Sequence, residues 1–194
     1  MQEKNFIQRN LGWIVPVGII VVLVMWGVSV YNGLISQNVA IDAQWAQVEN
    51  QLQRRFDLIP NLVATVKGIA GQEQEVFGAI ADARTRYSGA ATVDAKAQAA
   101  GQVESALGRL LVIAENYPQL QSSQSFRDLM VQLEGTENRI ATERMNYNNQ
   151  VKVLNASVKQ LPTMLFARIF GINERAYFEV SAEAQTNPTV DFKN

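Results

Sequence analysis

One arginine and three glutamates are the residues whose types and spacing could support chemistry. Arg55 interrupts a helical run of apolar residues, while Glu134, Glu137 and Glu143 lie close together on a later helical stretch. Grouped carboxylates can act as general acids and bases or bind a divalent cation. An arginine beside a carboxylate can instead form an ion pair that fixes the register of two helices, or line a pocket for a polar ligand. We favour the ion pair, because solvated helix faces routinely carry several carboxylates.

The composition excludes most other chemistry. The 194 residues include no cysteine and no histidine, which rules out disulfides, cysteine nucleophiles, histidine bases and zinc bound through nitrogen or sulfur. The sequence contains no glycine-rich phosphate loop. Its net charge is -1 without a basic face, so nucleic acid is not an expected partner. We therefore expect no catalytic residues, no metal, no cofactor and no enzymatic activity.

Arg55 belongs to a helix whose apolar residues recur at alternating spacings of three and four. Seven of the eight positions of this repeat are apolar, and we call these eight positions the seam. The seven are Trp45, Val48, Leu52, Ile59, Leu62, Val66 and Ile69. An apolar stripe of this kind must be covered by other helices. Arg55 fills the eighth position, so it needs a polar partner at that interface.

Three further helices are predicted to cover the seam. Apolar periodicity indicates one ending near Tyr87, one over residues 94–117 that Thr92 or Asp94 can cap, and one from Ser125 to Leu161. The last of these turns polar at Thr136, Glu137 and Glu143, where an antiparallel pairing would bring it opposite Arg55. By helical rise, Glu143 is expected nearest to Arg55 and Glu137 next. The sequence thus predicts an all-α fold with an antiparallel up-and-down four-helix bundle.

Residues 34–88 can be interpreted as one helix or two. Unbroken, they would rise about 80 Å, and the next helix, at about 36 Å, would leave the lower part of the seam to oligomer contacts. A break between Gly68 and Gly71 lets the fourth helix, about 57 Å long, run back along the first. We favour the break, because it covers the seam within one chain.

Residues 11–31 form an uncharged apolar segment of 21 residues. At about 1.5 Å per residue it can cross a hydrocarbon core of about 30 Å, and Trp13, Trp26 and Tyr31 lie near its ends. A cleaved signal peptide is the alternative, but its apolar part is usually about 7 to 15 residues long. We predict a tail over 1–10, a transmembrane anchor over 11–33, a helical domain over 34–180 and a polar tail over 181–194.

Basic residues suggest how the anchor is oriented. Lys4 and Arg9 precede the apolar segment, and the next basic residues are Arg54 and Arg55. Because positive charge is retained on the cytoplasmic side, we expect the N-terminus inside and the helical domain outside the cytoplasm.

Three long motifs resemble the LemA family of bacterial membrane-anchored helical proteins. They are ENQLQRRFDLIPNLVATVKG at 49–68, AENYPQL at 114–120 and QLEGTENRIATERMNYNNQVKVLN at 132–155. The similarity extends over about 31–178 and includes YNGLI at 31–35. The resemblance implies a single-pass anchor in a bacterial inner membrane, a four-helix antiparallel bundle and no established enzymatic activity.

The chain after the fourth helix is a second candidate site. Residues 161–172 carry only one charge, Arg168. Four antiparallel helices return the chain to within about 10 Å of the level at which the anchor leaves the bilayer. The residues that could contact lipid or a partner protein are Phe166, Arg168, Ile169, Phe170 and Phe178. The alternative is that they cap the bundle core.

Asparagines are unusually frequent in the fourth helix. Asn138, Asn146, Asn148 and Asn149 lie within twelve residues of one another, although asparagine is a weak helix former. They can hydrogen-bond between helices or subunits, or simply form exposed polar surface.

Two classes of function remain. The first is a membrane-anchored scaffold or interaction module that contacts the lipid bilayer and binds another copy of itself or another membrane protein. The second is a ligand sensor or enzyme that uses Arg55 with Glu134, Glu137 and Glu143. A deep pocket around Arg55 would favour the second class, and a closed seam would favour the first. We favour the scaffold.

Overall fold

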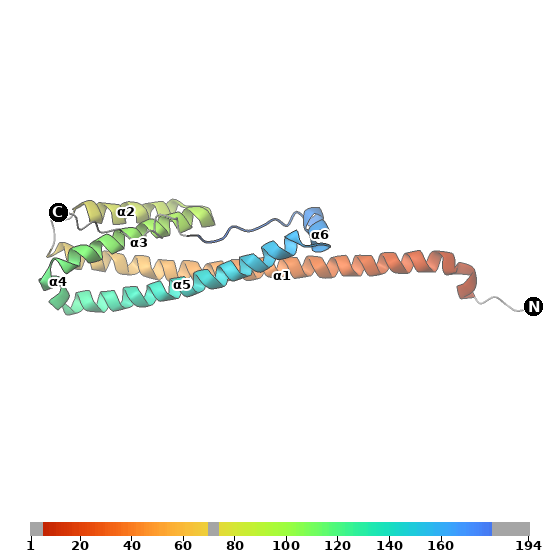
Figure 1. Ribbon diagram of the computed structural model, residues 1–194, viewed down its shortest axis with the longest axis horizontal. Coiled ribbons are helices and arrows are strands. Elements are labelled where there is room, and N and C mark those ends of the chain that lie inside the picture. The colour runs from red at the N-terminus through yellow and green to blue at the C-terminus, as the bar shows by residue number, and fades with distance from the viewer. Residues whose placement is uncertain (1–5, 70–73, 180–194) are drawn as a thin grey trace, which may run out of the picture. The chain divides into compact units, whose positions relative to one another are not determined.

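The computed structural model describes residues 6–69 and 74–179, with side chains from residue 13 onward. These stretches contain six α-helices and no β-strand, which confirms the all-α prediction (Figure 1). The helices are α1 (Phe6–Lys67), α2 (Gln74–Gly89), α3 (Val93–Glu115), α4 (Pro118–Ser122), α5 (Gln124–Lys159) and α6 (Thr163–Phe170). The predicted tail over 181–194 and residues 1–5 of the N-terminal tail lie outside the described residues.

The chain divides into two compact units. The first combines Met1–Ile41 with Gln150–Arg175, and the second combines Asp42–Asn149 with Ala176–Asn194. The long helices α1 and α5 each contribute one part to each unit. The two candidate sites therefore fall in different units, and each is described within its own.

The second unit is an antiparallel bundle built from α1, α2, α3 and α5. Each of these helices runs opposite to the one before it, and α2 pairs with α3 as a hairpin (Figure 1). From Val48 to Val66 the seam is buried, since Val48, Leu52, Leu62 and Val66 are each 1% exposed or less. The bundle and the break between its first two helices are as predicted, because α1 ends at Lys67 and α2 begins at Gln74.

Local sequence signals explain most of the helix ends. The Thr92 hydroxyl accepts a hydrogen bond of 3.2 Å from the Ala95 backbone N–H and so caps α3. Pro118 opens α4, where its missing N–H costs nothing. The predicted start of the last bundle helix at Ser125 is slightly wrong: α5 begins at Gln124, and Ser123 accepts the capping bond from the Phe126 N–H at 3.4 Å.

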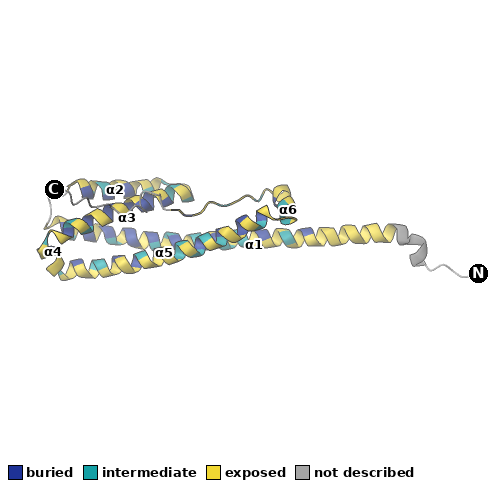
Figure 2. Cartoon of the chain, in the orientation of Figure 1, coloured by how far each residue is buried: buried dark blue, intermediate teal, exposed yellow. Residues whose placement is uncertain are grey.

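The first unit contains the apolar beginning of α1, the end of α5 and α6. The apolar stretch of α1 is exposed on all sides, and only 6% of its most apolar window is buried (Figure 2). Among the described residues, α1 is the one helix long and apolar enough to cross a membrane. Further along, Leu34 and Ile41 of α1 are buried, as are Val151 and Leu154 of α5. This unit thus has a small core of its own beside an uncovered apolar helix.

Candidate functional site

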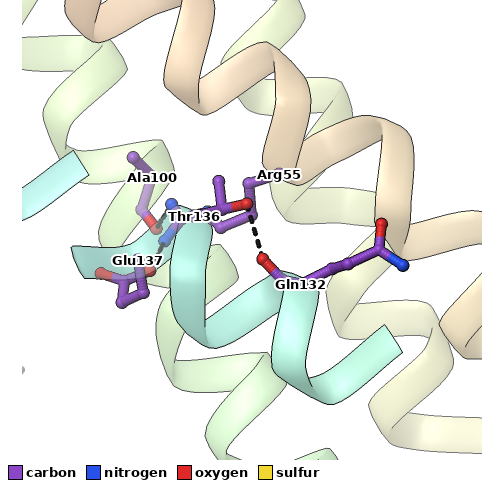
Figure 3. A network of polar contacts seen from close by, with 5 residues as sticks. All are labelled: Arg55, Ala100, Gln132, Thr136 and Glu137. Carbon is purple, nitrogen blue, oxygen red and sulfur yellow. Dashed lines mark hydrogen bonds and ion pairs between the residues drawn. The ribbon is translucent and has the colours of Figure 1, made fainter. Parts of the chain in front are cut away.

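Arg55 is the most deeply buried charged residue of the described chain, at 1% exposed. Its Nη1 donates a hydrogen bond of 2.6 Å to Glu137 Oε2 on α5, and its Nη2 donates one of 3.2 Å to the Ala100 carbonyl on α3 (Figure 3). The carbonyl of Ala100 belongs to the alanine-rich part of α3, where small side chains allow close helix packing. Arg55 therefore joins three helices of the bundle at one point.

The surroundings of this ion pair are asymmetric. The Arg55 side chain is 2% exposed, whereas the Glu137 side chain is 41% exposed. Thr136, beside Glu137, is buried but donates its hydroxyl to the Gln132 carbonyl at 2.8 Å within α5 (Figure 3). Among the described residues, Arg55 Nε has no hydrogen-bond partner. The pair thus runs from the core to the surface, and the guanidinium keeps one buried donor unused.

The three glutamates singled out from the sequence do not converge. Counting helical rise placed Glu143 closest to Arg55, but Arg55 pairs with Glu137, and Glu143 instead accepts a hydrogen bond of 2.5 Å from Gln44. Glu134 is exposed. Within the described ranges, no three acidic residues are close enough to hold a metal ion. The structure gives no geometric support to a carboxylate site made of these three residues.

A second charged pair, which the sequence did not reveal, lies near Arg55. Lys96 forms an ion pair with Glu49, and its Nζ lies 5.9 Å from the ring centroids of both Trp45 and Tyr87. Burial raises the pKa of Tyr87 to about 12, with the Glu49 charge as a second cause and Arg55 acting in the opposite direction. Of these residues only Trp45 lies on the seam. The apolar periodicity therefore could not predict the ion pair between Lys96 and Glu49.

A surface hollow of about 440 Å³ lies between α3 and α5. Glu104, Glu134 and Glu137 line it together with apolar residues that include Leu107 and Leu133. Partial burial of its carboxyl group raises the pKa of Glu104, and the nearby charge of Glu137 adds to this effect, whereas Arg55 and Arg144 oppose it. The hollow reaches the exposed end of the ion pair, not the guanidinium, because Arg55 itself is buried.

The second candidate site divides between the two units. Phe166 and Phe170 lie on α6 in the first unit, with their rings 5.1 Å from Trp26 and 4.8 Å from Tyr31 of α1. Arg168 and Ile169 of the same helix are exposed. Phe178 does not belong with them: it is 2% exposed in the second unit, with its ring 5.7 Å from that of Trp45. Phe178 is a core residue, which corrects its assignment to a membrane or partner contact.

Asparagines of α5 hold the extended chain that follows α6. Asn148 accepts a 2.8 Å hydrogen bond from the Phe178 N–H and donates one of 3.1 Å to the Phe178 carbonyl. Asn155 makes the same two bonds with Arg175, at 2.8 and 2.9 Å. Asn148 was among the asparagines noted in the sequence, but Asn155 was not. Both stand seven residues apart on one face of α5, which is the signal that could have identified them.

Comparisons with known proteins bear on this architecture. A model of the LemA family matches residues 44–192, most of the chain. The chain belongs to the LemA family. It is similar to Magnetosome protein MamQ 2 and MamQ 1 of Paramagnetospirillum magneticum, each 28% identical over 80% of this chain and 67% of the relative. Magnetosome protein MamQ of Magnetospirillum gryphiswaldense is 26% identical over the same shares.

The family assignment fits what the structure shows. The match covers nearly all of the second unit, including Arg55, Glu137 and Asn148. The LemA motifs at 49–68 and 132–155 contain Arg55 and Glu137, the two residues of the ion pair. This LemA-family chain is a membrane-associated helical protein.

Proposed function

We propose that this chain is a membrane-tethered, non-enzymatic scaffold whose helical bundle binds protein partners, including a second copy of itself. The observation that supports the proposal is the closed polar seam. Arg55 is 1% exposed, and two of its nitrogens already bond to Glu137 and Ala100. An enzyme or sensor needs polar groups that reach its ligand, and Arg55 cannot do so while the bundle is intact.

The proposal places α1 across a bacterial inner membrane with the second unit outside the cytoplasm. The uncovered apolar start of α1 supports the membrane span, since such a surface is stable in lipid and costly in water. Lys4 and Arg9 support an N-terminus inside the cell. The tether keeps the bundle at the membrane surface, where other membrane proteins are its available partners.

A ligand sensor is the second candidate function, and the hollow between α3 and α5 is the feature that favours it. Its apolar floor and its three glutamates suit a cationic amphipathic ligand. A ligand there would contact Glu137 and could alter its ion pair with Arg55. We favour the scaffold because the hollow is open to solvent and Arg55, a buried charged residue of the bundle, does not line it.

Replacing the ion pair by apolar residues separates these two functions. The double variant Arg55→Met and Glu137→Met removes both charges at similar volume, an exchange that is often neutral or stabilising. In membranes of cells that express the full chain, the scaffold proposal expects this variant to give the same chemically crosslinked assemblies as the parent. A matched surface variant is Val131→Glu, at a position of α5 that is 69% exposed. It tests whether the exposed face of α5 contributes to the crosslinked assemblies.

Two results would contradict the scaffold. If the double variant melts at the parent's temperature but loses the assemblies, the ion pair itself has a regulatory role and the sensor is favoured. If the parent chain yields no crosslinked assembly at all, it binds no stable partner under these conditions and the scaffold proposal fails.

A further inference from the structure

Helix α6 has an apolar face that no part of the described chain covers. Leu165 is 52% exposed, Ile169 is 74% exposed and Leu161, just before the helix, is 70% exposed. Leu165 and Ile169 are four residues apart and so lie on one side of the helix. The opposite side packs inward, where Ala167 is 2% exposed. The helix therefore carries apolar residues on both sides, and Leu165 and Ile169 point away from the protein.

The inner contacts of α6 fix its place on α1. The Phe166 ring meets the Trp26 ring edge-on at 5.1 Å, and a Cβ on Gly27 would come within 2.9 Å of Phe166 Cε1. Phe170 lies 4.8 Å from Tyr31 between ring centroids. Because Gly27 has no side chain, the Phe166 ring can reach the backbone of α1. Helix α6 is thus packed beside the last residues of the uncharged segment 11–31.

This position decides which medium surrounds the exposed face. Trp26 stands only about 7 Å, five helical residues, before the end of the apolar segment at Tyr31. If that segment crosses a bilayer, a side chain in ring contact with Trp26 lies at the depth of the boundary between hydrocarbon and headgroups. The other side of the same short helix cannot then be far from lipid, because a helix with its side chains is only about 10 to 12 Å across.

The charge of the surrounding chain fits the same location. Residues 150–175 contain four basic residues and one acidic residue, although the whole chain has a net charge of -1. The four are Lys152, Lys159, Arg168 and Arg175, and the acidic residue is Glu174. Arg168 is exposed and adjoins Ile169. Basic residues beside an exposed apolar helix face are typical of helices that lie at the surface of an anionic membrane.

We propose that α6 is a second membrane contact, in which Leu165 and Ile169 insert at the boundary of the bilayer while Arg168 binds lipid phosphate. The inference rests on α1 spanning the membrane, as the proposed function requires. It adds that the chain touches the bilayer twice, at points separated by more than 130 residues of sequence. The contact docks the end of α5 beside the anchor.

Spin labels can measure the depth of α6 in the full-length protein. The chain has no cysteine, so Leu165→Cys and Ile169→Cys each provide a single nitroxide site at an exposed position. The labelled proteins are reconstituted into vesicles of phosphatidylcholine and phosphatidylglycerol, and accessibility is measured to oxygen, which concentrates in lipid, and to a water-soluble nickel chelate. Val131→Cys, at an exposed apolar position of α5 in the second unit, is the matched control.

We expect an inversion of accessibility between the two surfaces. Labels at 165 and 169 should collide more with oxygen than with nickel, and the label at 131 should show the reverse. If the labels at 165 and 169 collide more with nickel than with oxygen, as the label at 131 does, α6 lies in water and the inference is overturned. Low accessibility to both reagents at 165 and 169 would mean that a protein surface or a second copy covers the face, which also overturns it.

A label in the anchor separates this inference from the proposed function. Val22 is 65% exposed near the middle of the apolar segment. If Val22→Cys reports deep lipid while 165 and 169 report water, only the α6 contact is wrong. If Val22→Cys also reports water, α1 does not span the bilayer and both proposals fail. Phe166→Ala removes the ring that packs against Trp26. In the Leu165→Cys protein this substitution should reduce the accessibility of the label to oxygen. In the Val22→Cys protein the same substitution should leave the accessibility of the label unchanged.

Discussion

At the scale of single residues, Arg55 and Glu137 carry opposite charges of equal size but lie in different environments. The arginine side chain is 2% exposed and the glutamate side chain 41% exposed. Removing the glutamate therefore leaves a buried cation without its counter-charge, whereas removing the arginine leaves a carboxylate that water can solvate. The contribution of the pair to stability should depend on which partner is changed.

Glu137→Gln should lower the free energy of unfolding by about 2 kcal/mol. This lies between the 3 to 5 kcal/mol typical of a fully buried pair and the value below about 1 for an exposed one. For a chain of this size the expected fall in melting temperature is about 4 to 8 °C. Thermal melts of the full chain in detergent, followed by circular dichroism at 222 nm, measure it.

Glu134→Gln provides the control on the same helix, because Glu134 is exposed and forms no part of the ion pair. Its melting temperature should stay within about 1 to 2 °C of the parent, as expected for surface substitutions. Equal effects of the two variants would mean that Arg55 gains nothing specific from Glu137.

The sequence predicted that Arg55 needs a carboxylate from the last bundle helix, but it did not identify which one. Helical rise pointed to Glu143, whereas the ion pair uses Glu137, nearly two turns away. Counting helical rise gives the position of a residue along the bundle axis only if the two helix axes are aligned and the offset between their ends is known. No sequence pattern reports the tilt of the helices or that offset. Gln44 and the Lys96–Glu49 pair were missed because polar residues beside the seam have no period of their own.

At the scale of helices, the contact between α6 and α1 depends on a missing side chain. Gly27→Leu should displace α6, because even the first added carbon would lie 2.9 Å from Phe166 Cε1. Displacement should expose the peptide bond after Arg168, so trypsin should cleave there several times faster in the variant, as expected when a local opening becomes easier. Mass spectrometry of timed digests of the full chain measures the rate.

Gly33→Leu is the matched control for this experiment. A Cβ at Gly33 meets nothing within 4 Å, so cleavage after Arg168 should proceed at the parent's rate. If both glycine variants accelerate cleavage equally, the effect comes from the leucine itself rather than from the contact with Phe166.

The start of α3 provides a second prediction for an element. Thr92→Ala removes the oxygen that accepts the Ala95 N–H, which should cost about 1 kcal/mol and lower the melting temperature by about 2 to 4 °C. Thr92→Ser keeps that oxygen and should restore most of the loss. A serine variant as unstable as the alanine variant would show that the threonine methyl group, not the cap, matters.

Helix existence was easier to predict than helix detail. The seam residues from Val48 to Val66 are buried as their period indicated, but Ile69 is 41% exposed and Leu161 is 70% exposed. Both keep the phase of the repeat but lie beyond the ends of their helices, at Lys67 and Lys159. Helix α4 was missed because five residues are too few to show a period.

At the scale of the whole molecule, one carboxyl group should shape the dependence of stability on pH. The pKa of Glu104 is raised from 4.5 in the folded state, first by partial burial and then by the charge of Glu137. The folded state therefore binds this proton more tightly than the unfolded state. The stabilisation is fully present below pH 4.5 and is lost as pH rises through the folded pKa.

Glu104→Gln should remove that dependence, because glutamine mimics the protonated form at every pH. Relative to the parent, the variant should gain melting temperature as pH rises from 4.5 toward neutrality. Parallel melts across this range measure the difference. A difference that is constant with pH would mean that the Glu104 pKa is the same in the folded and unfolded states.

The orientation of the molecule in its membrane is also testable. Lys4 and Arg9 favour an N-terminus inside the cell, which puts Asn194 outside the cytoplasm. We therefore expect activity from a reporter fused after Asn194 if that reporter is of a kind that folds only outside the cytoplasm. Alkaline phosphatase and green fluorescent protein fusions to the full chain in a bacterial host provide the two complementary measurements. Fluorescence without phosphatase activity would reverse the predicted orientation.

The asparagines of α5 have a consequence for how the chain tolerates change. Asn148 and Asn155 bond to the peptide N–H and carbonyl of Phe178 and of Arg175 respectively. Such recognition does not depend on which amino acid is present, except that proline lacks the N–H. The two asparagines are constrained by this geometry, because aspartate would lose the donor and leucine would lose both bonds. Asparagine retained at both positions would be the signature of this arrangement among related sequences.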